Sequence, residues 1–335
     1  MLDTLSLAAS NLISPPILFF VLGGLAVLVG SDLVIPREVA AALPLYLLLA
    51  IGFRGGAEFA HSGLSLDFFK AAVAGLVLGF ALPSLAFFVL RRFGRLDPAN
   101  AGAIAAHYGS ISAITFVTAQ GFLTRMDVPT SGYMVAVMAL MESPGVLTGI
   151  FLGRLFTSHP AVAATGGGNT KAVGPALREA LLGGSVLLLL GSFGIGLATG
   201  ERGMALLQPL VKDLFPGALA LFLLDLGMTA ARRFREFLRL GWFLAVFGLV
   251  MPLTAAALGA LVSALAGLHT GDAALLMTLA ASASYIAAPA AVRLALPEAN
   301  PSLSITLSLG ITFPFNILVG IPLYYAVAQT LLGAR

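Results

Sequence analysis

Two short stretches of small and polar residues interrupt segments that are otherwise strongly apolar. They read GSISAITF at residues 109–116 and ASASYIAA at residues 281–288. Where two half-helices begin at such breaks, their N-termini present free N–H donors and the positive end of the helix dipole, which suits a small anion. The predicted substrate-binding residues are Gly109, Ser110, Ser112, Ala113, Ile114, Thr115, Ser282, Ala283, Ser284, Tyr285 and Ile286.

A carboxylate and an amide lie in other apolar segments and could bind a coupling ion. Glu142 stands two residues before Pro144, and Asn316 follows Pro314 at the equivalent place further along the chain. Intramembrane acids are costly and usually functional. Glu142 could hold Na⁺ or carry a proton; alternatively, it caps a chain broken at Pro144. Asn316 could ligate an ion or serve as a packing amide bonded across helices. The predicted ion-coupling residues are Glu142, Ser112, Thr115, Ser284 and Asn316, with Na⁺ expected at Glu142 and Thr115.

The composition indicates what must position these residues. The chain is 59% hydrophobic and only 10% charged, with a mean hydropathy of +1.00, whereas soluble globular proteins carry roughly 25% charged residues. This predicts an integral membrane protein in the lipid bilayer. The absence of cysteine excludes disulfides and cysteine-ligated metals, and a net charge of +3 is a poor basis for nucleic-acid binding.

Apolar runs between charged or Pro/Gly breaks predict ten spans. Sorted into alternating loops, the 18 Lys and Arg residues divide two to one between the sides. The richer side should be cytoplasmic, which predicts a plasma (inner) membrane protein with both termini outside. The predicted spans are 15–30, 39–53, 68–90, 99–124, 132–156, 176–199, 209–231, 237–266, 273–296 and 303–331.

The two halves of the chain resemble each other. Residues 1–156 and 176–335 flank a Gly- and Ala-rich stretch, 157–175, which reads as a cytoplasmic linker. The matches keep their order along the chain: Pro83 with Pro252, Gly52 with Gly227, Ser110 with Ser282, Ser112 with Ser284, and Pro129 with Pro301. Five spans per half would insert the second half in the opposite sense. The sequence therefore predicts an all-α membrane protein of two inverted five-helix repeats, with helices 4 and 9 interrupted.

Small residues in membrane helices can also serve only for packing. The matched positions of the two stretches in the two halves favour a substrate site instead, near the midplane where interrupted helices of the repeats meet. Among other polar residues, His107 could shuttle protons or simply be a hydrogen-bonded helix histidine. Asp225 could be a coupling residue or pair with an arginine.

Several motifs resemble the sodium-dependent bicarbonate transporter family. They include SPPILFFVLGGLAVLVGSDLVIP, IGFRGGAEF, RLALPEANPS and the tail GIPLYYAVAQTLLG. The resemblance covers essentially the whole chain. It implies bicarbonate uptake driven by the Na⁺ gradient, a core of spans three to five and eight to ten, a gate of the remaining spans, and a homotrimer.

The chain departs from the family pattern at both stretches. Family members carry Ser-Gly-Ser-Thr where this chain reads Ser-Ala-Ile-Thr at residues 112–115, and Ser-Ser-Ser-Asp where it reads Ser-Ala-Ser-Tyr at residues 282–285. A carboxylate is the stronger ligand for a hard cation, so Tyr285 keeps other readings open: a proton-coupled or uncoupled carrier of another small anion, or a non-transporting membrane sensor. A cytoplasmic regulatory protein could dock on the linker. An enzyme is not expected, because the sequence has neither a paired-aspartate motif nor a His-rich metal box.

Overall fold

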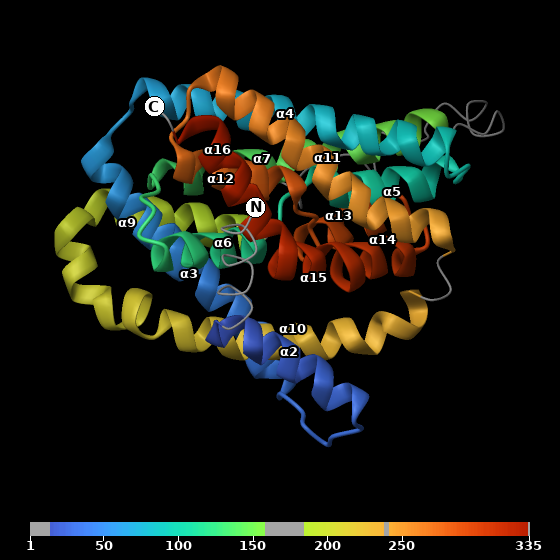
Figure 1. Ribbon diagram of the computed structural model, residues 1–335, viewed down its shortest axis with the longest axis horizontal. Coiled ribbons are helices and arrows are strands. Elements are labelled where there is room, and N and C mark those ends of the chain that lie inside the picture. Colours follow the sequence, from blue (N-terminus) through green and yellow to red (C-terminus); the bar gives the residue numbers. More distant parts are fainter. Residues whose placement is uncertain (1–13, 158–183, 238–240, 334–335) are drawn as a thin grey trace.

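The computed structural model describes residues 14–157, 184–237 and 241–333, and all regular secondary structure in these ranges is helical (Figure 1). The predicted linker lies outside these ranges except for Thr157. So do Lys171, Arg178, Arg239 and Arg335, which are among the Lys and Arg residues counted for the predicted orientation.

Helices account for nearly all of the described chain. The first part holds α2 (Pro15–Leu28), α3 (Arg37–Ser62), α4 (Leu66–Arg92), α5 (Pro98–Gly109), α6 (Ala113–Arg125) and α7 (Tyr133–Phe156). The second part holds α9 (Gly184–Gln208), a π-helical turn (Pro209–Asp213), α10 (Phe215–Phe237), α11 (Trp242–Ala266), α12 (Thr270–Ala281) and α13 (Ala287–Ala295). It ends in α14 (Pro301–Leu307), α15 (Phe313–Phe315) and α16 (Ile321–Leu332), joined by π-helical turns at Ser308–Thr312 and Asn316–Gly320.

Several helices extend past their predicted spans, α3 and α9 furthest. The second span was predicted to end at residue 53, before a charge and two glycines, but α3 continues to Ser62. The Arg54 guanidinium lies over the Phe215 ring, 5.7 Å from its centroid, so this cation packs without ending the helix. Helix α9 likewise continues past residue 199 to Gln208, through a bend at Gly200, whose φ is 52°.

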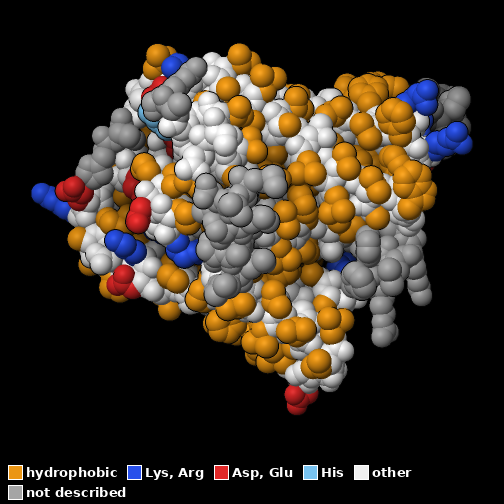
Figure 2. Space-filling view, in the orientation of Figure 1, with side chains coloured by type: hydrophobic (Ala, Val, Ile, Leu, Met, Phe, Trp, Pro, Cys, Tyr) orange, Lys and Arg blue, Asp and Glu red, His pale blue; other side chains and the backbone are white. Residues whose placement is uncertain are grey.

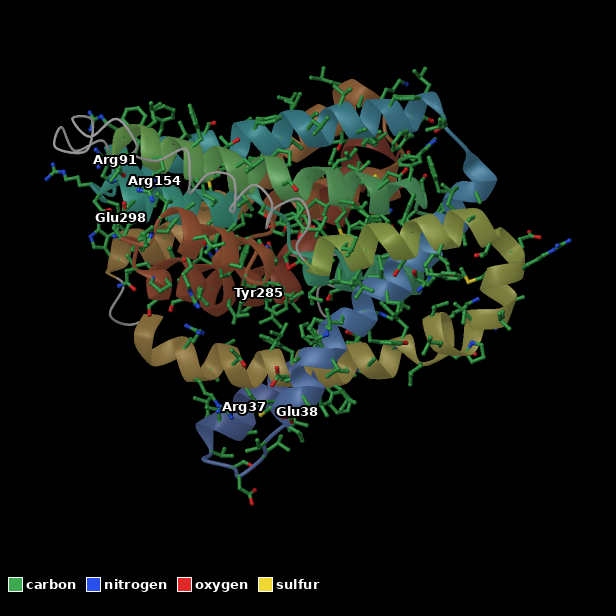
Figure 3. All side chains as sticks on the ribbon, turned by 180° about the vertical axis from the view of Figure 1, so that it is seen from behind. Arg37, Glu38, Arg91, Arg154, Tyr285 and Glu298 are labelled. Carbon is green, nitrogen blue, oxygen red and sulfur yellow. The ribbon has the colours of Figure 1, made fainter. Side chains whose placement is uncertain are left out.

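The exterior matches a chain that crosses a membrane. Six helical runs in the described residues are long and apolar enough to span: Arg37–Ala60, Leu66–Arg92, Tyr133–Phe156, Val186–Arg233, Trp242–Ala266 and Pro301–Leu332. Hydrophobic side chains cover much of the visible surface, and charged ones gather toward its edges (Figure 2). Seen from behind, Arg154, Glu298 and Arg91 lie together at one end, whereas Tyr285 lies near the middle of the view (Figure 3). The chain is a multi-pass membrane protein.

The helices form two groups. In the first group α2 packs along α10 and α3 packs along α9, and these helices lie apart from the layer that contains α4, α5 and α11 (Figure 1). Glycines allow both contacts. A Cβ on Gly227 would overlap the Phe20 carbonyl, and a Cβ on Gly56 would overlap the Phe193 carbonyl. Such close backbone approach is typical of membrane helices that pack through small residues.

The second group comprises α4 to α7 and α11 to α16, and it contains both polar stretches. Helix α5 lies against α7 with very small separation, because a Cβ on Gly145 would overlap the Gly109 carbonyl. Helix α7 runs through Pro144 without ending. The alternative interpretation of Glu142, as a cap for a chain broken at Pro144, is therefore wrong: backbone hydrogen bonds of the helix continue on both sides of that proline.

Both polar stretches separate two helices. Helix α5 ends at Gly109 and α6 begins at Ala113, while α12 ends at Ala281 and α13 begins at Ala287. The residues between them are extended or irregular, so their backbone groups need partners from elsewhere.

Candidate functional site

The two breaks cross each other and satisfy each other's backbone. The main-chain N–H of Ser284 donates to the carbonyls of His107, at 2.8 Å, and Ser110, at 3.0 Å. The main-chain N–H of Ser112 donates to the Ser282 hydroxyl at 2.8 Å. Unwound backbone is tolerated at membrane depth only when buried in protein or facing a water-filled cavity. This crossing meets that condition in the core of the second helix group.

Each break leads into a helix N-terminus that a serine helps to satisfy. The Ser112 hydroxyl accepts from the Thr115 N–H, 3.3 Å away, at the start of α6. The Ser284 hydroxyl accepts from the Ala288 N–H, also 3.3 Å away, in the first turn of α13. Serine is a favoured N-cap residue. Two positive helix ends therefore lie at the crossing, where negative charge is stabilised.

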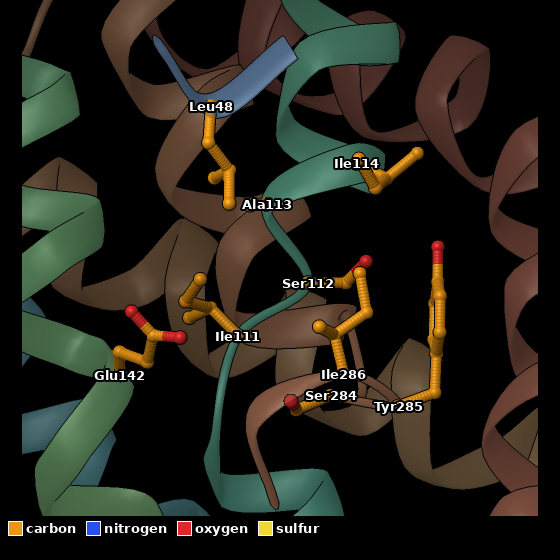
Figure 4. A pocket seen from close by; sticks show the side chains of 9 residues that line it. All are labelled: Leu48, Ile111, Ser112, Ala113, Ile114, Glu142, Ser284, Tyr285 and Ile286. Carbon is orange, nitrogen blue, oxygen red and sulfur yellow. The ribbon is translucent and has the colours of Figure 1, made fainter. Parts of the chain in front are cut away.

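A small pocket opens at the crossing (Figure 4). Its volume is about 20 Å³, and a single water occupies roughly 10–15 Å³ on the same measure. The pocket as it stands therefore holds one water or one small cation, and a polyatomic anion requires it to widen. Its described lining residues are Leu48, Ile111, Ser112, Ala113, Ile114, Glu142, Ser284, Tyr285 and Ile286.

Polar atoms without hydrogen-bond partners concentrate around the crossing of the two breaks. Six buried side-chain polar atoms have no partner within the described ranges, and four of them belong to residues at or beside the crossing. Buried polar groups are otherwise almost always paired, so such a cluster indicates a place that takes water or a ligand. The four atoms are His107 Nε2, Ser110 Oγ, Thr115 Oγ1 and Tyr285 Oη, of which the last lies close enough to the Ser112 side chain to interact with it weakly.

Glu142 supplies the only carboxylate among the described residues of the lining. Its side chain projects from α7 and is only 8% exposed. Within the described part of the chain it forms no ion pair. A buried carboxylate without a partner is unfavourable unless it binds a cation or a proton. Carboxylate and hydroxyl oxygens are ligands suited to a hard cation, so Glu142 and the nearby hydroxyls fit Na⁺ chemically.

The sequence of the chain matches one known protein family. A family model described as the Na⁺-dependent bicarbonate transporter superfamily matches residues 15–329, nearly the whole chain. The chain belongs to this superfamily. The match includes both breaks, Glu142 and every described helix except the end of α16. The comparison with curated proteins finds no match.

Part of the predicted set of substrate-binding residues lines the pocket directly: Ser112, Ala113, Ile114, Ser284, Tyr285 and Ile286. The others are buried behind it. Gly109 packs under Pro83, and the Ser282 hydroxyl donates to the Leu279 carbonyl. The predicted residues outside the described lining are Gly109, Ser110, Thr115, Ser282 and Ala283.

Asn316 also lies outside the described lining of the pocket. Its Nδ2 donates to the Ala281 carbonyl at 2.9 Å, and its Oδ1 accepts from the Tyr324 hydroxyl at 2.7 Å. These bonds match the packing alternative for this amide. An ion could use Oδ1 only alongside the tyrosine.

The sequence analysis did not predict two residues that line the pocket, Leu48 and Ile111. Ile111 lies between two serines that were singled out, so its position was a usable signal. Leu48 comes from α3 in the other helix group, and no local pattern indicates that this helix faces the crossing.

Proposed function

We propose that the protein is a secondary active transporter that imports bicarbonate together with Na⁺. The observation that carries the proposal is the meeting of two helix N-termini and unpartnered buried hydroxyls at the crossing, whose pocket Glu142 lines. The N–H and O–H donors suit the oxygens of an anion, and the carboxylate suits the cation that accompanies it.

The proposed architecture has ten spans in two inverted repeats, in a plasma membrane with both termini outside. Matched hydrogen bonds support it. Asn100, near the start of α5, accepts from the Asn300 N–H at 2.7 Å, and Asp272, near the start of α12, accepts from the Ser131 N–H at 2.8 Å. In each case the N-terminal part of one interrupted helix holds a loop of the other half. The paired contacts of α2 with α10 and of α3 with α9 show the same exchange between halves.

Glu142 is the proposed Na⁺ residue, with hydroxyl oxygens of Ser112, Ser284 and Thr115 as further ligands. The lining carries Tyr285 where the family resemblance implies an acid, and a phenol is the weaker cation ligand. Coupling therefore depends on Glu142. A pocket with one acid among its described lining residues also suits proton coupling, which is the second candidate function and is favoured by the same unpaired carboxylate.

Transport requires the pocket to change size. Leu48 on α3 covers it from the first helix group, while the other described lining residues belong to the second group. Many secondary transporters expose one site alternately by moving one helix group against the other. We propose that the group of α2, α3, α9 and α10 moves as the gate, and that the structure represents a closed state. A homotrimer and a cytoplasmic regulator docked at residues 157–175 belong to the same proposal.

Uptake of labelled bicarbonate into proteoliposomes tests the function. The inward Na⁺ gradient is present or absent at constant pH, and the native protein is compared with Glu142→Gln. We expect uptake that the Na⁺ gradient stimulates and that the mutant loses. Uptake stimulated instead by an inward proton gradient would support the second candidate, and no uptake under either gradient would contradict both.

A further inference from the structure

We infer that a second binding site for a small oxyanion lies next to the crossing, in a separate cavity between α5, α13 and α14. The cavity has a volume of about 100 Å³, several times that of a single water on the same measure. It shares no described lining residue with the Glu142 pocket. Its polar lining residues are His107, Arg293 and Ser304.

His107 presents an unsatisfied acceptor in this cavity. Its side chain is completely buried, and Nδ1 lies 2.7 Å from the Ser284 carbonyl oxygen. A carbonyl only accepts hydrogen bonds, so Nδ1 carries the proton and Nε2 of the neutral ring carries a lone pair. Nε2 has no partner in the described part of the chain. With the Nδ1 edge bonded to Ser284, the other edge of the ring is the one left to face the cavity.

Arg293 supplies the complementary charge. It projects from α13, is exposed and forms no ion pair with any described residue. No Asp or Glu occurs among the described lining residues. The cavity therefore combines a guanidinium, which binds two oxygens of a planar or tetrahedral anion side by side, with an acceptor that needs an O–H donor.

This donor and acceptor pattern selects a class of ligand. The anion must carry negative oxygens for Arg293 and one O–H group for His107 Nε2. Bicarbonate and dihydrogen phosphate share that chemistry, whereas chloride lacks it. The inference rests on the proposed function only for the identity of the anion: bicarbonate would make this a second station on the transport path, and phosphate would make it a regulatory site.

The position of His107 connects this site to the first one. An anion bonded to Nε2 would be linked through the imidazole ring to the Ser284 carbonyl, and the Ser284 hydroxyl lines the Glu142 pocket. An anion in the second cavity would therefore change the hydrogen bonding of Ser284, which lies in the second break. Arg293, in the last turn of α13, is one of the arginines assigned to the side predicted to be cytoplasmic, so bicarbonate would reach this site after leaving the first.

The natural lack of cysteine allows a direct binding test. Ile305 lines the cavity and is partly exposed, so the Ile305→Cys variant carries one reporter thiol. Its alkylation rate is measured in nanodiscs at constant pH with added bicarbonate, phosphate or chloride of equal ionic strength. At ten times the Kd, a bound anion should slow labelling roughly tenfold by occupancy alone. Chloride should not slow it.

Two variants of the reporter chain identify the ligand-binding groups. His107→Asn keeps an N–H donor for the Ser284 carbonyl but removes Nε2, and Arg293→Gln removes the charge. Both should abolish protection, while Arg92→Gln, an exposed arginine outside the cavity, should preserve it. A thermal unfolding midpoint equal to that of the parent shows that a variant is folded. If Arg293→Gln does not fold, Arg293→Lys replaces it; this variant keeps the charge without the paired N–H groups and should retain only partial protection.

The outcomes separate the possibilities. Protection by bicarbonate supports a transport station, and protection by phosphate alone supports a regulatory site of the same chemistry. Labelling that neither anion slows, or protection that survives both His107→Asn and Arg293→Gln, would overturn the inference. The assay needs neither Na⁺ nor a gradient, so its failure leaves the proposed transport intact, and a failure of Na⁺-driven uptake leaves this site intact.

Discussion

The main-chain N–H of Ser112 donates to the hydroxyl of Ser282 at 2.8 Å, which ties the first break to the second. Both residues are almost completely buried. Each half of the chain thereby supplies a hydrogen-bond partner that the other half's unwound backbone lacks. The same arrangement keeps two helix N-termini at one place.

Replacing the acceptor of this bond tests its importance. Ser282→Ala leaves the Ser112 N–H buried without a partner, which should cost about 1–3 kcal/mol of unfolding free energy. A lower thermal unfolding midpoint in detergent would show this. Ser302→Ala, at an exposed position, should change stability by less than about 0.5 kcal/mol. Equal stability of the two variants would contradict the structural role of the bond.

The close contact of α5 and α7 predicts a strong effect of one methyl group. The Cβ of Gly145→Ala would overlap the Gly109 carbonyl at the edge of the first break. Overpacking of this kind typically costs about 1–3 kcal/mol, and here it also shifts the backbone of the site, so transport should fall as well.

The matched control for that change is Gly194→Ala on α9. A Cβ there meets no described atom within 4 Å, and alanine favours helix by about 1 kcal/mol over glycine. Stability should therefore be unchanged or higher. If Gly145→Ala behaves like Gly194→Ala in thermal unfolding and uptake, the helices are further apart than the structure places them.

Replacing Tyr285 with an acid should strengthen the binding of Na⁺ that accompanies bicarbonate uptake. Tyr285→Asp would add a second carboxylate to a pocket that contains Glu142, and carboxylates strengthen the binding of hard cations. The Na⁺ concentration for half-maximal bicarbonate uptake should fall severalfold. Tyr285→Phe, which removes only the hydroxyl, serves as the control and should leave it nearly unchanged. The hypothesis that Na⁺ binds beside Tyr285 fails if both variants respond alike.

Asp272 should be a structural residue rather than a coupling residue. Its carboxylate accepts from the Ser131 N–H, the Ser131 hydroxyl and the Tyr133 hydroxyl, at 2.6–2.8 Å. Asp272→Asn replaces one acceptor oxygen with a donor facing these groups, so unfolding free energy should drop by about 1.5–3 kcal/mol.

Asp127→Asn is the control for Asp272→Asn, because Asp127 is exposed and its φ of 54° is one that Asn also tolerates. Thermal unfolding should distinguish the two variants clearly. A loss of Na⁺ dependence in Asp272→Asn at unchanged stability would instead assign this acid to coupling.

The sequence predicted the membrane class, most helices and the position of both breaks, because these depend on local patterns. Gly109 and the serines around it weaken a helix wherever they occur, and Glu142 stands out in any apolar run. The extension of α3 past Arg54 could not be read locally, since the Phe215 ring against which that guanidinium packs is distant in the sequence.

Contacts between distant segments limited the prediction of the site. The bond from the His107 ring to the Ser284 carbonyl joins residues of opposite halves, and nothing in either segment specifies it. Leu48 was missed for the same reason. Asn316 was singled out by its match to the first half, but its partners Ala281 and Tyr324 lie on helices whose packing only the structure shows.

The central claim is that Na⁺ and bicarbonate enter together. Its most direct test measures entry of labelled Na⁺ into proteoliposomes when an inward bicarbonate gradient is imposed at constant pH. The account predicts that bicarbonate drives Na⁺ above its equilibrium level in the native protein and fails to do so in Glu142→Gln. Na⁺ entry that ignores the bicarbonate gradient in the native protein, or that remains coupled to it in Glu142→Gln, would contradict the account.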